Sequence, residues 1–217
     1  MAERPVFVPS TSGSLLVDEI LISFKWHPGL ATSQKKKNVL ELHQVAASAH
    51  GLSPLLEISS KSDIKVGRNL SAFHLKMQFH GREATVECLY QGSKVFDNGG
   101  PFEDLYWVSS KEAKQDERIR QSGRLIGFSL DGKRYPTSPP TVFYDWLYFS
   151  ALYPHREWLR KREEWAGFTD IEFNPERSWN CQARSFAAFV SLQRRGMLDE
   201  AITSFERFYD IMRSAAI

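Results

Sequence analysis

Three stretches of the chain alternate between apolar and polar residues, the pattern typical of half-buried β-strands. The alternating stretches are residues 20–24, 73–79 and 126–130. Each of the last two is followed by a dipeptide that favours a tight turn, His80-Gly81 and Asp131-Gly132. We therefore predict two β-hairpins, in which the chain returns as a partner strand at Arg82 and at Lys133.

Apolar residues at helical spacing predict helices in the remainder of the chain. The predicted helices are residues 32–50, 86–96, 111–121, 141–152, 181–195 and 198–213. Thr32 or Ser33 is placed to cap the first of them, and Gly51 is placed to end it. Helices and strands follow one another irregularly, without a βαβ rhythm. We therefore expect an α+β fold that is mostly helical, with small antiparallel β elements.

The 217 residues show no repeat and no linker, so we expect a single domain over residues 1–217, with residues 1–14 as an extended N-terminal arm. Apolar residues make up 42% of the chain, which is enough to bury a core. The formal net charge of +2 excludes a general polyanion-coating protein and leaves room for a local basic groove. Lys35, Lys36 and Lys37 are either a solvated helix face or a contact for phosphates.

Cysteine content and targeting patterns point to the cytoplasm. The chain has two cysteines, Cys88 and Cys181, both inside helical patterns, so a disulfide framework is not expected. Met1 to Gly13 lacks a signal-peptide pattern, and no apolar run approaches membrane-spanning length. We expect a cytoplasmic protein that does not contact a membrane.

Several common functional motifs are absent from the sequence. There is no glycine-rich dinucleotide loop, no Walker loop and no Gly-x-Ser-x-Gly elbow. The six histidines have no zinc-type spacing with each other or with cysteine. We therefore expect neither a metal nor another cofactor.

The most informative polar pattern lies in the predicted helix at residues 86–96. Glu87, Tyr90, Gln91 and Lys94 share one helix face at spacings of three, four and seven. On a continuous helix, Glu87 and Lys94 are ~10 Å apart along the axis at 1.5 Å per residue. That separation suits a carboxylate and an amine on either side of a sugar, and a solvated helix face is the alternative.

Two segments of this region resemble motifs of the NADAR family. Residues 70–73 (Leu-Ser-Ala-Phe) are similar to its Leu-Ser-Asn-Phe segment, and residues 87–94 (Glu-Cys-Leu-Tyr-Gln-Gly-Ser-Lys) resemble its Glu-His-x-Tyr/Phe-Gln-Ala-x-Lys helix. Order, spacing and the hairpin between the segments agree. Ala72 and Cys88 depart from the pattern, since they replace the usual Asn and His.

The whole chain resembles the NADAR subgroup found beside DarT-type DNA ADP-ribosyltransferase toxins. The segments that carry this likeness are residues 24–29, 56–62, 143–146 and 170–175. The resemblance implies a NADAR/YbiA-like fold. It also implies an antitoxin that hydrolyses the N-glycosidic bond between ADP-ribose and the exocyclic amine of guanine in single-stranded DNA. The toxin would then be a functional partner, with physical binding left open.

Two other functions stay open at this point. The protein could be a non-catalytic antitoxin that binds and occludes its toxin, although such a protein would need neither Glu87 nor Lys94. It could also be an N-glycosidase for a small nucleotide-like metabolite, as some NADAR relatives are thought to be.

The resemblance implies that Glu87 and Lys94 are the catalytic residues. Cleavage of the glycosidic bond builds positive charge on the anomeric carbon, which the carboxylate of Glu87 can stabilise. Lys94 could attack that carbon as a neutral amine and form an imine. As a cation it would instead hold phosphate or hydroxyl oxygens. The sequence leaves both roles open.

Eight further residues are expected to bind the substrate: Ser71, Phe73, Tyr90, Gln91, Gly99, Gly100, Asp145 and Trp146. Gly99 and Gly100 could bring backbone N–H groups close to a pyrophosphate, or could simply form a turn that stops the helix. Asp145 stands in an aromatic helix, where a capping or buried hydrogen-bonding role is the alternative. Trp146 could stack on a base or pack in the core.

Overall fold

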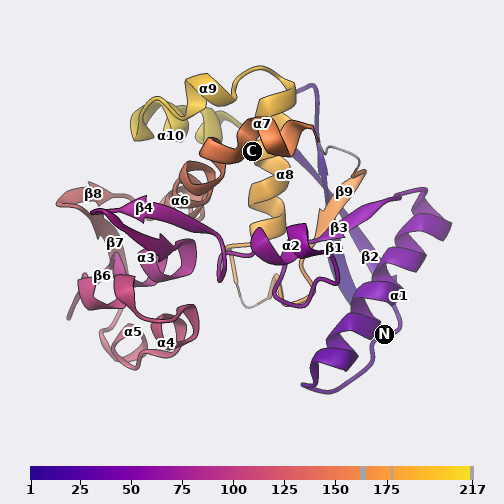
Figure 1. Cartoon of the computed structure of the whole chain (residues 1–217), viewed down its shortest axis with the longest axis horizontal. Coiled ribbons are helices and arrows are strands. Elements are labelled where there is room, and N and C mark those ends of the chain that lie inside the picture. Colours follow the sequence, from indigo (N-terminus) through magenta and orange to yellow (C-terminus); the bar gives the residue numbers. More distant parts are fainter. Residues whose placement is uncertain (162–164, 177, 216–217) are drawn as a thin grey trace. The chain divides into compact units, whose positions relative to one another are not determined.

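The computed structural model describes residues 1–161, 165–176 and 178–215. The fold is α+β, with 44% of the chain in helices and 20% in strands, so the predicted class and the helical majority are confirmed. The chain forms two compact units (Figure 1). Unit 1 comprises Met1–Ser71 and His155–Ile217, and unit 2 comprises Ala72–Pro154. One domain over residues 1–217 stays a prediction.

Unit 1 contains a sheet of four strands in the order β2-β1-β9-β3. The strands are β1 (Ala2–Pro9), β2 (Val17–Phe24), β3 (Leu55–Glu57) and β9 (Gly167–Thr169). β1 pairs antiparallel with β2 along its whole length, whereas β3 and β9 are parallel. The expected arm at residues 1–14 therefore needs correction, because residues 2–9 are an inner strand. Its proline and serine content obscured the apolar run from Pro5 to Val8.

Side-chain alternation along β1 divides the core of unit 1 into two layers. Val6 lies on the face that packs with α1 (Thr32–His50), through Leu42 and Ala46. On the other face Phe7 pairs with Phe168, whose ring lies 4.8 Å from that of Phe186 on α8 (Gln182–Arg194). Figure 1 shows α1 and α8 on opposite sides of this sheet.

Helix α1 has the predicted bounds but a different N-cap. Its N-cap is Ala31, and no side chain caps the helix, so the predicted capping role of Thr32 or Ser33 is wrong. Gly51 ends the helix with a φ of 66°, which confirms its predicted role, because glycine adopts this left-handed conformation without steric cost.

Shorter helices complete unit 1: α2 (Lys65–Asn69), α7 (Arg156–Arg160), α9 (Leu198–Ala201) and α10 (Phe205–Ala215). The 3₁₀ turn η2 (Tyr153–His155) precedes α7. The continuous helix predicted at residues 198–213 is thus two helices. Ile202, Thr203 and Ser204 separate them, and the hydroxyl of Thr203 donates to the carbonyl of Glu200 at 2.7 Å, which favours a local turn.

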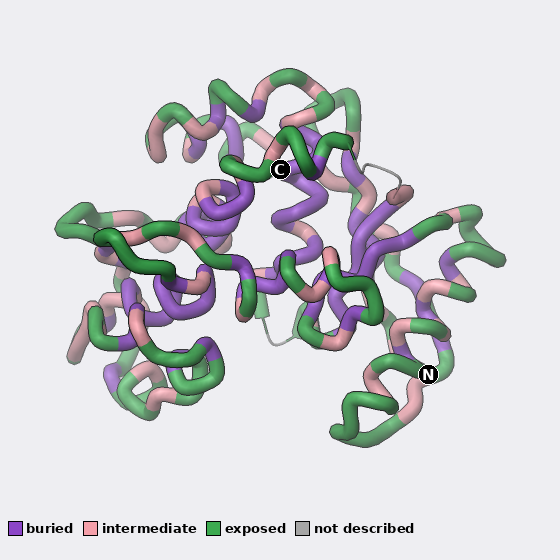
Figure 2. The backbone as a smooth tube through the Cα atoms, in the orientation of Figure 1, coloured by how far each residue is buried: buried purple, intermediate pink, exposed green. Residues whose placement is uncertain are grey.

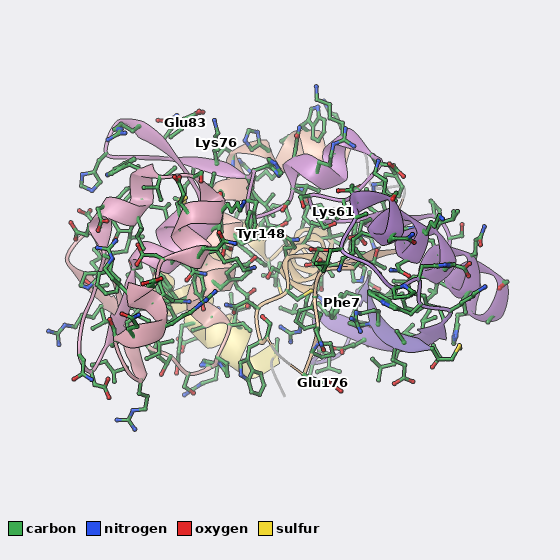
Figure 3. All side chains as sticks on the ribbon, turned by 90° about the horizontal axis from the view of Figure 1, so that it is seen from below. Phe7, Lys61, Lys76, Glu83, Tyr148 and Glu176 are labelled. Atoms are coloured by element: carbon green, nitrogen blue, oxygen red, sulfur yellow. The ribbon has the colours of Figure 1, made fainter. Side chains whose placement is uncertain are left out.

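Unit 2 contains both predicted hairpins. Its elements are β4 (Lys76–Phe79), β5 (Arg82–Thr85), α3 (Val86–Gly92), β6 (Lys94–Phe96), η1 (Glu103–Trp107), α4 (Ser110–Gln115), α5 (Arg118–Gln121), β7 (Leu125–Leu130), β8 (Lys133–Tyr135) and α6 (Val142–Leu152). The turn residues have positive φ: 50° and 71° at His80-Gly81, 53° and 72° at Asp131-Gly132. Both turn predictions are confirmed. Figure 3 shows Lys76 and Glu83 on the first hairpin, where they form an ion pair at 3.0 Å.

Helix α3 is the centre of unit 2. All seven of its residues are buried (Figure 2), because η1, α4 and α6 pack around it. The helix ends at Gly92 rather than at Phe96. A side chain at Gly92 would lie 2.6 Å from the ring of Tyr106, and residues 94–96 pair with β7. The predicted helix at 86–96 is therefore wrong beyond Gly92, since strand pairing overrides its helical spacing.

Candidate active site

A buried helix normally carries apolar residues on every side, yet α3 carries Glu87 and Gln91. Glu87 is 6% exposed and Gln91 is 7% exposed. The side-chain nitrogen of Gln91 donates a hydrogen bond of 3.0 Å to Oε1 of Glu87. Thr85 caps the helix by accepting from the backbone N–H of Cys88 at 3.2 Å. The backbone N–H of Glu87 donates to the carbonyl of Ala72 at 3.1 Å, which fixes residues 72–73 beside the first turn.

Lys94, the first residue of β6, bonds the same amide of Gln91. Its Nζ donates a hydrogen bond of 2.7 Å to Oε1 of Gln91. Glu87, Gln91 and Lys94 therefore form one continuous chain of polar groups, which we call the Glu-Gln-Lys chain. The expected separation along a continuous helix is wrong, because Lys94 is not helical. The carboxylate and the amine nevertheless lie at one place, as expected, because the amide of Gln91 bonds both of them.

The surroundings of Lys94 lower the pKa of its amine. Its Nζ lies 4.8 Å from the centre of the Tyr90 ring. Burial lowers the pKa of Lys94 to about 8, against the opposing effect of Glu87 and with a further lowering by the positive charge of Lys114. At a pKa of about 8, roughly one tenth of the amines are unprotonated at pH 7. An amine with this property can act as a nucleophile.

Tyr90 is held by a group of aromatic rings. Its ring lies 5.4 Å from that of Phe128 and 5.3 Å, edge to face, from that of Tyr144. Phe143 stacks on Phe128 at 4.6 Å. This packing fixes the ring on which the amine of Lys94 rests.

Phe73 lies at the start of unit 2 and is half-buried. The hydroxyl of Ser110 donates to its carbonyl at 2.9 Å and contacts the hydroxyl of Thr85 at 2.8 Å. Nζ of Lys114, one helical turn after Ser110, lies 5.0 Å from the centre of the Phe73 ring. No pattern in the sequence singles out Lys114, because residues 111–121 carry only the pattern of an exposed helix.

Gly99 and Gly100 form a turn directly after β6. A side chain at Gly100 would lie 2.2 Å from the carbonyl oxygen of Lys94, and one at Gly99 would lie 2.9 Å from the hydroxyl of Ser122. Close packing against neighbouring atoms therefore accounts for both glycines. The turn follows a strand, so its interpretation as a helix stop is wrong. Contact with a pyrophosphate stays a prediction.

The remaining predicted binding residues are Asp145, Trp146 and Ser71. Asp145 is buried and Trp146 is partly exposed on α6, which packs against α3. Ser71 is buried at the end of the first segment of unit 1, and its N–H donates to the carbonyl of Arg68 at 3.1 Å. Their roles toward a substrate stay predictions.

The departures from the NADAR motif lie outside the Glu-Gln-Lys chain. Cys88 packs with Leu105 and Ala113, and its thiol donates to the carbonyl of Val108 at 3.2 Å. Ala72 takes part through its backbone carbonyl. Cys88 thus lies where α3 packs against η1 and α4. Glu87, Gln91 and Lys94, which form the Glu-Gln-Lys chain, all agree with the motif.

Unit 1 contains a separate buried polar network around Glu57. The carboxylate accepts hydrogen bonds from the hydroxyls of Ser59 and Thr169, both at 2.6 Å, and from the N–H of Ile171 at 2.9 Å. Nε2 of His43 lies 2.8 Å from the Thr169 hydroxyl. Burial, reinforced by the negative charge of Asp170, raises the pKa of Glu57. Burial also raises the pKa of Asp170.

Over the described ranges, no group of three or more His, Cys, Asp and Glu side chains is arranged to hold a metal ion. Within the same ranges, no helix combines the length and the apolar character needed to cross a membrane.

The Glu-Gln-Lys chain can be compared with the motif of a known family. The buried glutamate, glutamine and lysine of unit 2 stand at the positions of the NADAR motif. Over residues 2–217 the chain matches the family described as DarT1-associated NADAR antitoxin, and it belongs to that family. The resemblance drawn from residues 70–73 and 87–94 is thus confirmed. The family name implies a DarT toxin as partner, and NADAR membership suggests a glycosidase-type hydrolase. No curated protein matches the chain.

Proposed function

We propose that this protein hydrolyses the N-glycosidic bond between ADP-ribose and the exocyclic amine of guanine in single-stranded DNA. By restoring the base it reverses the modification made by a DarT-type toxin, and it acts in the cytoplasm, where that DNA is. The observation that carries the proposal is the buried Glu-Gln-Lys chain, in which a carboxylate and an amine of lowered pKa share one amide.

Glu87 suits the stabilisation of positive charge on the sugar. As the bond to guanine stretches, the anomeric carbon and ring oxygen of the ribose gain positive charge. A carboxylate that is already buried and hydrogen-bonded needs no reorganisation to meet that charge. Gln91 contributes by holding one carboxylate oxygen in place. Glu87 therefore acts as the electrostatic partner of the transition state.

Lys94 suits the attack on the anomeric carbon. Its neutral amine forms a bond to that carbon while the bond to the guanine nitrogen breaks, and the guanine nitrogen takes up the proton that the amine gives up. Opening of the ribose ring turns the adduct into an imine. Water then adds to the imine carbon and releases ADP-ribose, and the lysine amine is regenerated. The net reaction consumes one water.

Activity can be tested on defined oligonucleotides. The purified protein is incubated with single-stranded DNA carrying ADP-ribose on guanine or on thymine, and released ADP-ribose is measured by mass spectrometry. We expect release from guanine only. Addition of borohydride during turnover should trap ADP-ribose covalently on Lys94 in the wild type and leave Lys94→Arg unlabelled. The proposal is wrong if neither oligonucleotide is cleaved.

Protection of cells distinguishes repair from occlusion. Wild-type protein, Glu87→Gln and Lys94→Arg are each co-expressed with the toxin, and ADP-ribosylated DNA is quantified. If the protein repairs DNA, cells that express either variant should accumulate modified DNA and should not be protected from the toxin. Equal protection by all three proteins would favour physical blocking of the toxin.

A further inference from the structure

Unit 2 contains a second lysine next to the Glu-Gln-Lys chain. Lys114 belongs to α4, whereas Lys94 begins β6, and 20 positions separate them in the sequence. The two ammonium groups are close enough that the charge of Lys114 lowers the pKa of Lys94. Lys94 is largely enclosed, and Lys114 is exposed. The site therefore combines one enclosed amine with one solvent-accessible cation.

The backbone around Lys114 is fixed to the same elements as Glu87. Ser110 bonds both the carbonyl of Phe73 and the hydroxyl of Thr85, the N-cap of α3. A capping box at Ser109 and Glu112 stabilises the start of α4, with both hydrogen bonds present. Because residues four apart share a helix face, Lys114 extends from the face that Ser110 anchors. Its ammonium group accordingly lies over the ring of Phe73.

Two like charges close together raise the free energy of the empty site. The charge of Lys114 disfavours the charged form of Lys94, whereas the nearby carboxylate of Glu87 favours it. A ligand that brings negative charge to Lys114 removes this repulsion. A diphosphate is such a ligand, since lysine binds phosphate as a compact point charge.

We propose that Lys114 is a phosphate-binding residue of this site, placed on Phe73 to hold the diphosphate of an ADP-ribosyl ligand while Lys94 faces the ribose. The inference rests on the proposed function for the identity of the ligand. It divides the two roles considered for Lys94 between two residues: the enclosed amine faces the sugar, and the exposed cation faces the phosphates.

The test uses ligands with and without phosphate. Binding of ADP-ribose and of adenosine to the wild type, Lys114→Met and Lys114→Arg is measured by calorimetry. Methionine keeps the unbranched side chain and removes the charge, so we expect ADP-ribose affinity to fall roughly tenfold. Arginine should keep most of the affinity. Adenosine, which has no phosphate, should bind all three proteins equally.

A matched control comes from the same helix. Lys111 is also an exposed lysine of α4, and its charge is not among those that act on Lys94. Lys111→Met should leave ADP-ribose affinity unchanged. The inference is overturned if the wild type does not bind ADP-ribose, if Lys114→Met binds it normally, or if Lys111→Met weakens it equally. Normal binding without cleavage of ADP-ribosylated guanine would instead disprove the proposed function and leave the role of Lys114 intact.

Discussion

Nζ of Lys94 donates a hydrogen bond of 2.7 Å to the side-chain oxygen of Gln91. An ammonium group can only donate and a carboxylate can only accept, so the amide has one orientation: oxygen toward Lys94 and nitrogen toward Glu87. Gln91 thus contacts both proposed catalytic residues, each through a different atom of its amide. Its amide connects helix α3 to strand β6.

Replacement of Gln91 by leucine should destabilise the protein and impair the site together. Leucine has a similar size but cannot bond either charge, and each charged group would remain buried without this partner. Unmet hydrogen bonds of this kind cost about 1–3 kcal/mol of the free energy of unfolding. Urea titration of Gln91→Leu measures the loss. Gln78→Leu, an exposed change on β4, is the control and should unfold like the wild type.

Glu87→Gln should show how much the negative charge of Glu87 contributes to turnover. The variant keeps the volume of the side chain and removes its negative charge, so the cation that develops on the ribose loses its stabilisation. We expect turnover of ADP-ribosylated guanine to fall by about 10²–10³, with little change in the affinity for ADP-ribose. Glu83→Gln, on the exposed side of the first hairpin, should behave as wild type. Loss of affinity in proportion to turnover would point to a binding role for Glu87.

Local sequence patterns were sufficient where local interactions determine the structure. The turns at His80-Gly81 and Asp131-Gly132 need positive φ, and the residues that tolerate it are visible in the sequence. The end of α1 at Gly51 is predictable for the same reason. The contact between Glu87 and Gln91 also followed from their spacing of four residues on one helix, whereas Lys94 bonds Gln91 from β6.

Other features depend on contacts between distant residues. The end of α3 at Gly92 is set by the ring of Tyr106 and by pairing of Lys94 with Phe128, neither of which leaves a local pattern. The effect of Lys114 on Lys94 requires that α4 be anchored beside α3. The inner position of β1 requires pairing with β9, more than 150 positions later, and only folding brings the two together.

The pH dependence of turnover should report the protonation of Lys94. If the neutral amine attacks, the rate of a single turnover rises with pH through the pKa of about 8 and then levels off. Glu87 raises this pKa and Lys114 lowers it. The midpoint should therefore move to higher pH in Lys114→Met, while Lys111→Met leaves it in place. A rate that falls over the same pH range would mean that Lys94 acts as a cation.

The buried acids of unit 1 should make the stability of the fold depend on pH. Glu57 and Asp170 have a pKa above the ordinary value, so the folded state keeps protons that the unfolded state has lost. Stability is then greatest at low pH and falls as pH rises through the raised pKa values. Burial lowers the pKa of His43 to about 4, which acts in the opposite direction, but only below the ordinary histidine value of 6.5. Between pH 6.5 and the lowered pKa of Lys94, about 8, the raised pKa values of Glu57 and Asp170 therefore dominate.

Glu57→Gln should weaken this dependence, because the amide keeps polar atoms beside Ser59, Thr169 and Ile171 and cannot ionise. Between pH 6.5 and 8 the wild type should lose on the order of 1 kcal/mol of unfolding free energy. The variant should lose less, and the remainder belongs to Asp170. Urea midpoints at several pH values give both slopes, and Glu19→Gln, an exposed change on β2, should retain the wild-type slope. Parallel slopes in wild type and Glu57→Gln would show that Glu57 is ionised in the folded protein.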